Sequence, residues 1–132
     1  MTPLRLRRAR RAAHRVLVDT ALERATPVPV EQIANVLDVR IVDSELSGAS
    51  AALIRVGDRA RIRVSPRNTY PGQRRFTIAH ELGHFVLGHS SAHVCNDERA
   101  TAACDPMQER EADVFASEIL MPEHAARRFC EV

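Results

Sequence analysis

Apolar residues recur along much of this chain at the spacing of one face of an α-helix. The pattern predicts helices over residues 4–24, 73–87 and 107–121, with a short helix after Pro29 and another over residues 123–132. In the short helix after Pro29, we expect Ile33, Val36 and Leu37 to face inward. Gly88 and Pro122 follow two of the longer helices and are expected to end them.

Three shorter segments have the character of β-strands, residues 39–43, 51–56 and 60–65. In the third, apolar residues alternate with arginines, as expected for a strand that is buried on one face only. Gly57–Asp58 separates the second segment from the third and predicts a hairpin. Helices before and after a small antiparallel sheet predict an α+β fold, and the length fits a single domain over residues 1–132.

Composition narrows the classes of protein to which this chain can belong. Hydrophobic residues make up 45% of it, but no stretch approaches the ~18 consecutive apolar residues of a membrane span. Asp19 and Glu23 interrupt the apolar residues near the N-terminus, so this region does not read as a secretory signal. The three cysteines are widely spaced and do not form a disulfide framework. We therefore expect a cytoplasmic protein with free thiols.

Positive charge is carried by arginine alone, with 19 arginines, no lysine and a net charge of only +2. Several arginines are concentrated in the segment RLRRARRAAHR near the N-terminus. Such a cluster can mark a nucleic-acid-binding surface, but the solvent-facing side of a helix explains it more simply. We expect neither direct nucleic-acid binding nor membrane contact.

The most informative segment is FTIAHELGHFVLGH, residues 76–89, which places three histidines and one glutamate in an otherwise apolar helix. His80 and His84 are four residues apart, so their side chains lie one above the other on the same helix face. With Glu81 they form H-E-x-x-H, in which the histidines bind zinc and the glutamate is a general base. Histidines with only a structural role in the core would not need Glu81 beside them. Iron, cobalt and manganese also suit two histidines and a carboxylate.

Catalytic zinc usually has three protein ligands, so a third must come from elsewhere in the chain. His89 does not fit, because on a continued helix it would point away from His80. The last long helix offers Glu109, at the edge of its apolar stripe, and Glu111, which faces a different side. We favour Glu109 over Glu111 on this helix-face argument. Asp113, one turn later, is placed to accept the free ring N–H of a ligand histidine.

Three segments together resemble the ImmA/IrrE family of metallopeptidases. They are PVPVEQIANVLDVRIV before the sheet, RRFTIAHELGHFVLGH in the centre and EREADVFASEILMP after it. The resemblance implies a zincin-like core, in which the small sheet is flanked by the H-E-x-x-H helix and a glutamate-bearing helix. It also implies zinc held by His80, His84 and Glu109, with Glu81 catalytic. Members of this family are typically encoded beside XRE-type helix-turn-helix repressors, and several inactivate that partner.

The leading hypothesis is therefore a zinc-dependent endopeptidase that hydrolyses a peptide bond in a regulatory protein, an XRE-type repressor encoded nearby being the expected partner. Glu81 would take a proton from a zinc-bound water, whose pKa zinc lowers to about 7, and deliver it to the leaving amine. An exposed edge strand over residues 60–65 could bind the substrate by strand addition. The alternative is a non-proteolytic regulatory or toxin–antitoxin-type binding protein with a structural or vestigial metal site.

Several residues have roles that the sequence leaves open. Tyr70, His93 and His124 are candidates for a further donor near the oxyanion of the reaction. Cys95, Cys104 and His93 could form a second metal site or a regulatory thiol, although the spacing of the two cysteines is not that of a zinc finger.

Overall fold

The structure is a computed structural model and describes residues 4–25, 27–46, 50–57, 59–67, 70–89, 93–95 and 105–121. Its elements follow the chain in the order α1 (Leu4–Asp19), α2 (Val30–Val36), β1 (Val39–Asp43), β2 (Ala51–Val56), β3 (Arg59–Val64), α3 (Pro71–Val86), β4 (His93–Cys95) and α4 (Pro106–Leu120). This order confirms the α+β class. None of the helices in the described part of the chain is long and apolar enough to cross a bilayer. The helix expected over residues 123–132 lies outside the described residues.

The four strands form one sheet in the order β1-β3-β2-β4, and this sheet is mixed. The pairs β2–β3 and β2–β4 are antiparallel, but β1 runs parallel to β3. The expectation of an antiparallel sheet was therefore wrong for β1. The hairpin is the reason: β3 returns between β2 and β1, and there it has the same direction as β1. Residue patterns show the faces of a strand, but not its neighbours.

The hairpin between β2 and β3 turns at Gly57, whose φ of 61° lies in the left-handed region that favours glycine. Along β3, Ala60, Ile62 and Val64 are buried, whereas the arginines between them are exposed or half-buried. This alternation confirms the prediction of a strand buried on one face. However, β3 lies between β1 and β2 and has no free edge, so strand addition at residues 60–65 is excluded.

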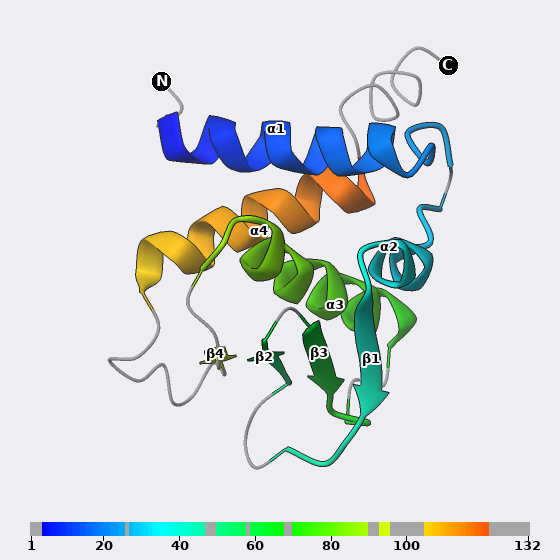
Figure 1. Ribbon diagram of the computed structural model, residues 1–132, viewed down its shortest axis with the longest axis vertical. Helices are drawn as coiled ribbons and strands as arrows, with labels where there is room; N and C mark the ends of the chain where they lie inside the picture. The colour runs from blue at the N-terminus through cyan, green and yellow to red at the C-terminus, as the bar shows by residue number, and fades with distance from the viewer. Residues whose placement is uncertain are drawn as a thin grey trace.

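The helices lie in layers on one face of the sheet (Figure 1). α3 packs directly against β2 and β3, α4 packs against α3, and α1 packs against α4. α2 contacts β1 and α3 at the side of the sheet. Among the described residues, no helix covers the opposite face of the sheet.

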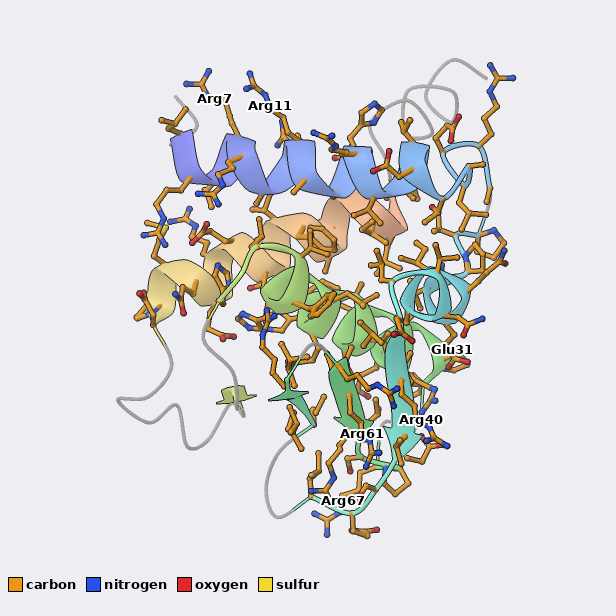
Figure 2. The ribbon with its side chains drawn as sticks, viewed as in Figure 1. Arg7, Arg11, Glu31, Arg40, Arg61 and Arg67 are labelled. Carbon is orange, nitrogen blue, oxygen red and sulfur yellow. The ribbon has the colours of Figure 1, made fainter. Side chains whose placement is uncertain are left out.

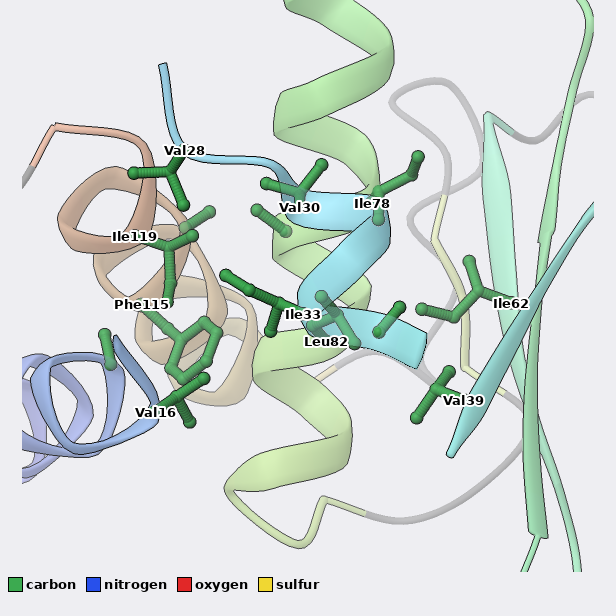
Figure 3. Close-up of a cluster of buried hydrophobic side chains, with 14 of the residues drawn as sticks. Val16, Val28, Val30, Ile33, Val39, Ile62, Ile78, Leu82, Phe115 and Ile119 are labelled. Carbon is green, nitrogen blue, oxygen red and sulfur yellow. The ribbon is translucent and has the colours of Figure 1, made fainter. Parts of the chain in front are cut away.

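One apolar core joins these layers. Val39 and Ile62 project from the sheet, Ile78 and Leu82 from α3, and Phe115 from α4 (Figure 3). Full burial of an aliphatic or aromatic side chain of this size stabilises the fold by roughly 1.5–3 kcal/mol. The core therefore fixes the position of α3 against both the sheet and α4.

α1 ends earlier than residue 24, where the sequence pattern had placed its end. Ala21 has a φ of 58° and so leaves the right-handed helical region. The N–H of Leu22 then donates to the carbonyl of Leu17, and the N–H of Ala21 to the carbonyl of Val18. Apolar periodicity does not reveal this end, because Leu22 still packs against the core.

The buried face of α2 was predicted only in part. Ile33 is buried and Leu37 packs against the core, as expected, but Val36 is 59% exposed. The helix has 7 residues, and its buried side consists of Val30, Ile33 and Ala34. Residues three or four apart share one face of a helix, so Val30, Ile33, Ala34 and Leu37 face the core. Val36 points to the other side.

Candidate active site

The two histidines of the H-E-x-x-H motif lie together on α3. Their Nε2 atoms are 3.1 Å apart, and their rings meet edge to face with centroids 4.8 Å apart. His84 is fully buried, and 13% of the His80 side chain is exposed. The spacing of four residues produces this arrangement, because it stacks two side chains on one helix face.

α4 brings one carboxylate against both imidazoles. The Oε2 atom of Glu109 lies 3.0 Å from Nε2 of His80, and its Oε1 atom lies 2.9 Å from Nε2 of His84. Glu111 is buried and pairs instead with Arg5 of α1. Of the two glutamates that the sequence left open, the structure therefore brings Glu109 to the histidines.

Asp113 contacts the other side of the His80 ring. Its Oδ1 atom lies 2.8 Å from Nδ1 of His80, one helical turn beyond Glu109. An imidazole that donates Nδ1–H to a carboxylate keeps its Nε2 lone pair for a metal ion. The Asp113 side chain is 56% exposed, so the site lies nearer to solvent at His80 than at the fully buried His84.

The second ring nitrogen of His84 has a partner that the sequence reasoning missed. Nδ1 of His89 lies 2.8 Å from Nδ1 of His84, and the His89 ring is buried. His89 would point away only if the helix continued. Instead Gly88 adopts a φ of 73°, the chain turns back, and the N–H of His89 donates to the carbonyl of His84. Gly88 as the end of the helix was the signal that could have found this contact.

Behind His89, two charged residues extend the contacts toward α1. Oε1 of Glu111 lies 3.6 Å from Nε2 of His89 and 2.5 Å from Nη2 of Arg5. Glu111 is only 3% exposed, and a buried carboxylate without a partner would be costly to desolvate. The series His84–His89–Glu111–Arg5 therefore joins the end of α3 to α4 and α1.

Glu81 is buried in surroundings that favour its protonated form. Its side chain is enclosed, and its Oε2 atom has no hydrogen-bond partner among the described residues. Burial raises the pKa of Glu81 to about 7; the charge of His80 acts against this rise and that of Glu109 adds to it. One ligand atom from each of His80, Glu81 and His84 lies within 4.8 Å of the others. A carboxyl group with a pKa near neutrality is suited to general acid–base work.

His80 is held in its protonated form when no metal is bound. Burial by itself lowers the pKa of His80, but the hydrogen bonds to Asp113 and Glu109 and the charges of Glu81 and Glu109 raise it to about 10. Both ring N–H groups then face carboxylate acceptors. A metal ion that binds at Nε2 must displace a proton from this atom.

Gly83, inside the H-E-x-x-H motif, allows α4 to approach α3 closely. A Cβ atom at this position would lie 3.1 Å from Cβ of Phe115 and 3.2 Å from Cα of Ala112. These distances are shorter than ordinary van der Waals contacts. The glycine therefore sets the separation of the two helices that carry the histidines and Glu109.

Arg55 of β2 holds the C-terminal end of α3. Its Nη2 atom donates to the carbonyl oxygens of Phe85 at 2.9 Å and of His84 at 3.3 Å. Carbonyls at a helix end have no partner within the helix, and the helix dipole favours a cation there. The guanidinium also lies 4.8 Å from the centre of the Phe85 ring. The sheet thus anchors the end of α3 that carries His84.

The donor set fits a tetrahedral zinc ion. Donor atoms bonded to such an ion at about 2.0–2.1 Å lie ~3.3 Å apart. The two Nε2 atoms are 3.1 Å apart, and one oxygen of Glu109 lies 3.0 Å from that of His80 and the other 2.9 Å from that of His84, so the donors are already close to this spacing. The unpartnered oxygen of Glu81 leaves a buried acceptor beside this set, as expected where a further group binds.

The structure does not bring Tyr70 to this site. Tyr70 is 73% exposed at the N-cap of α3, and ten helical residues, or about 15 Å, separate it from His80. For His93 and Cys95 only the backbone of β4 is described, and Cys104 and His124 lie outside the described residues. The roles considered for these four residues stay predictions.

Comparison with known proteins agrees with this geometry. Residues 34–131 match the peptidase M78 family, described as the IrrE N-terminal-like domain. The match includes α3 and α4, and with them every residue around the two histidines except Arg5. A search among curated proteins found no match. Because the match covers most of its length, the chain belongs to the ImmA/IrrE family of metallopeptidases.

Proposed function

We propose that this protein is a zinc-dependent endopeptidase with a zincin-like core. The observation that carries the proposal is the convergence of His80, His84 and Glu109 next to the buried, unpartnered oxygen of Glu81. His80 and His84 would hold the metal through Nε2, and Glu109 through its carboxylate. A bound zinc ion would polarise the scissile carbonyl and lower the pKa of a coordinated water.

Glu81 is the residue that moves the proton. With a pKa near 7, its carboxylate accepts a proton from the attacking water and releases it to the departing amine. Burial suits Glu81 to this role, because it removes the carboxylate from water and so raises its pKa toward neutrality. Asp113 and His89 orient the rings of His80 and His84 through their Nδ1 atoms.

The proposed substrate is a regulatory protein in the cytoplasm, with an XRE-type helix-turn-helix repressor encoded nearby as the first candidate. Membership of the ImmA/IrrE family supports this choice, since its members are typically encoded beside such repressors. Asp113, which contacts His80, is 56% exposed, so on this side the site lies close to the protein surface.

The variant Glu81→Gln tests the proposal. It keeps the size of the side chain but removes the proton acceptor, so cleavage of the purified repressor should fall about 100- to 10,000-fold. Zinc content, measured by atomic absorption, should stay near one ion per chain. Repressor fragments are followed by mass spectrometry, with zinc-free protein as a second control.

Two results would count against hydrolysis. Cleavage at the wild-type rate by Glu81→Gln would remove the proposed role of this residue. Recovery of intact repressor in a stable complex, with equal regulatory effect from wild type and variant, would favour the non-proteolytic binding protein with a structural metal site.

A further inference from the structure

Some arginines in the described part of the chain form ion pairs or hydrogen bonds with other residues, and others do not. Many of them form ion pairs or hydrogen bonds within the protein, among them Arg5, Arg10, Arg55, Arg63, Arg74 and Arg75. Arg40, Arg59 and Arg61 have no such partner among the described residues, and all three are exposed. Exposed arginines without such a partner among the described residues also occur elsewhere, as with Arg7, Arg8 and Arg11 of α1, so it is their place on the sheet that distinguishes these three.

The three arginines lie on the face of the sheet that no described helix covers. Arg40 of β1 is directly opposite Arg61 of β3, and Figure 2 shows their side chains close together on neighbouring strands. Arg59 is two residues before Arg61 and therefore points to the same side. Like charges directly opposite each other destabilise a sheet. The concentrated positive charge on this face therefore favours binding of a negatively charged partner.

This face is hollowed where the arginines meet. A groove of about 560 Å³ is lined by the three arginines together with Asp38, Ile54 and Ala60. Pockets that bind ligands have volumes of about 300–1,000 Å³, so the groove accommodates a few side chains of a partner. Asp38 supplies one negative charge against three positive ones, and Ile54 supplies an apolar surface.

We propose that this groove, formed by Arg40, Arg59 and Arg61, binds an acidic segment of the protein substrate. This proposal rests on the proposed function, and it adds a second surface that contacts the substrate besides the candidate active site. Guanidinium groups pair with carboxylates in a bidentate manner, which suits Asp and Glu side chains of an extended segment. None of the described residues that line the groove is aromatic, so they offer no stacking platform of the kind with which sheets bind single-stranded nucleic acid.

The groove lies on the opposite side of the sheet from α3 and hence from the metal ligands. It therefore acts on substrate affinity and leaves the chemical step unchanged. For a substrate that reaches both surfaces, loss of the groove should raise KM and leave kcat unaltered.

A binding experiment tests the groove without any cleavage. The protein is zinc-loaded Glu81→Gln, which keeps the probe intact, and the probe is a fluorescent dodecapeptide of alternating Glu and Ser. In this background, Arg40→Gln/Arg59→Gln/Arg61→Gln should weaken binding by about tenfold or more, as measured by fluorescence anisotropy at low salt.

The matched control is Arg7→Gln/Arg8→Gln/Arg11→Gln on α1, which removes the same charge from three other exposed arginines; Arg7 and Arg11 are labelled in Figure 2. It should change binding less than twofold. Thermal melting checks that both triple variants keep the fold. Equal loss of binding in the two triple variants, or no binding at all, would overturn the proposal. So would tighter binding of a single-stranded dodecanucleotide than of the peptide.

The two proposals fail in different ways. If the acidic peptide binds the groove but wild-type protein cleaves no repressor, the endopeptidase function is wrong and the acidic site stands. If the repressor is cleaved with the same KM by wild type and the groove variant, the groove is not a substrate contact.

Discussion

His84 is the most constrained side chain of the site. It is fully buried, its Nε2 atom faces His80 and Glu109, and its Nδ1 atom faces His89. A buried polar ring without partners would be costly, so these contacts determine both its orientation and the nitrogen that carries its proton. If His89 Nδ1 accepts the Nδ1–H of His84, the Nε2 lone pair is left for the metal.

The variant His89→Ala should therefore weaken zinc binding about 10- to 100-fold, the usual effect of removing a partner of a ligand histidine. The affinity is measured by competition with a chromophoric chelator. The visible spectrum of the cobalt form should change as well, because the orientation of the His84 ring alters the ligand field. His89→Gln, whose side-chain oxygen can accept the same hydrogen, should recover part of both effects.

Removal of an exposed histidine, His14→Ala on α1, is the matched control and should leave affinity and spectrum unchanged. Unaltered zinc affinity in His89→Ala would show that His89 only fills space behind His84.

The raised pKa of His80 predicts how the metal-free protein responds to pH. Its folded-state pKa of about 10 exceeds the ordinary histidine value of 6.5, so protonation of His80 stabilises the metal-free fold. This stabilisation is complete below about pH 6.5 and is lost as the pH rises through 10. The melting temperature of the metal-free protein should fall between pH 7 and 10, and most of this range lies above the pKa of about 7 of Glu81.

The same proton should be released when zinc binds. Calorimetric titration near pH 8, in buffers with different ionisation enthalpies, should give about one proton released per zinc. His80→Gln should show a flatter dependence of melting temperature on pH. A melting temperature that rises from pH 7 to 10 would contradict the assigned protonation of His80.

The contact between α3 and α4 determines how far the two sets of candidate ligands are apart. Gly83 lies at this contact, and the neighbouring atoms are Cβ of Phe115 and the backbone of Ala112, which cannot move aside alone. The core that buries Phe115 also fixes α4 from its other side. Added volume at Gly83 must therefore separate the helices.

For Gly83→Ala we expect a net loss of about 1–2 kcal/mol in unfolding free energy, because overpacking exceeds the gain in helix propensity. Thermal melting should show a decrease of several degrees, and zinc affinity should fall as Glu109 moves from the histidines. Gly72→Ala, in the first turn of the same helix, has no atom within 4 Å of the new methyl group and should not decrease stability. Equal melting temperatures for the two variants would exclude this role of Gly83.

In the whole molecule, the candidate metal centre lies between α3, which packs on the sheet, and α4, which packs on α3. α3 is held by the sheet through Arg55, and α4 is held by α1 through the pair of Glu111 and Arg5. A zinc ion bound by His80, His84 and Glu109 would join two helices that are distant in the chain. Its binding energy then contributes to the stability of the whole fold.

Removal of zinc should accordingly lower the melting temperature. At a free zinc concentration about 100-fold above Kd, binding stabilises the fold by about 2.7 kcal/mol, which corresponds to roughly 10 °C for a chain of this length. Melting is compared before and after treatment with a chelator, and again after zinc is restored. The double variant His80→Ala/His84→Ala should show no difference between the three conditions. A zinc-loaded wild-type protein that melts unchanged after chelation would contradict a link between the two helices.

The features that could be predicted from the sequence depend on local periodicity. The spacing of four residues stacked His80 and His84, and the alternation in β3 identified its buried face. The same reasoning placed Glu109 and Asp113 on one side of α4. Each inference needs only the number of residues per turn of a helix or the two-residue alternation of a strand. Both follow from local backbone geometry.

Other features depend on which segments meet in space. The parallel pairing of β1 with β3, the return of His89 to His84 after Gly88, and the pair of Glu111 with Arg5 all join positions that no repeat connects. The groove of Arg40, Arg59 and Arg61 also arises only when two strands lie side by side. The sequence alone thus determined the family motifs and the face on which each side chain lies, because these follow from backbone geometry. Only the tertiary structure decided which faces meet, because packing of the whole core selects the neighbours of each element.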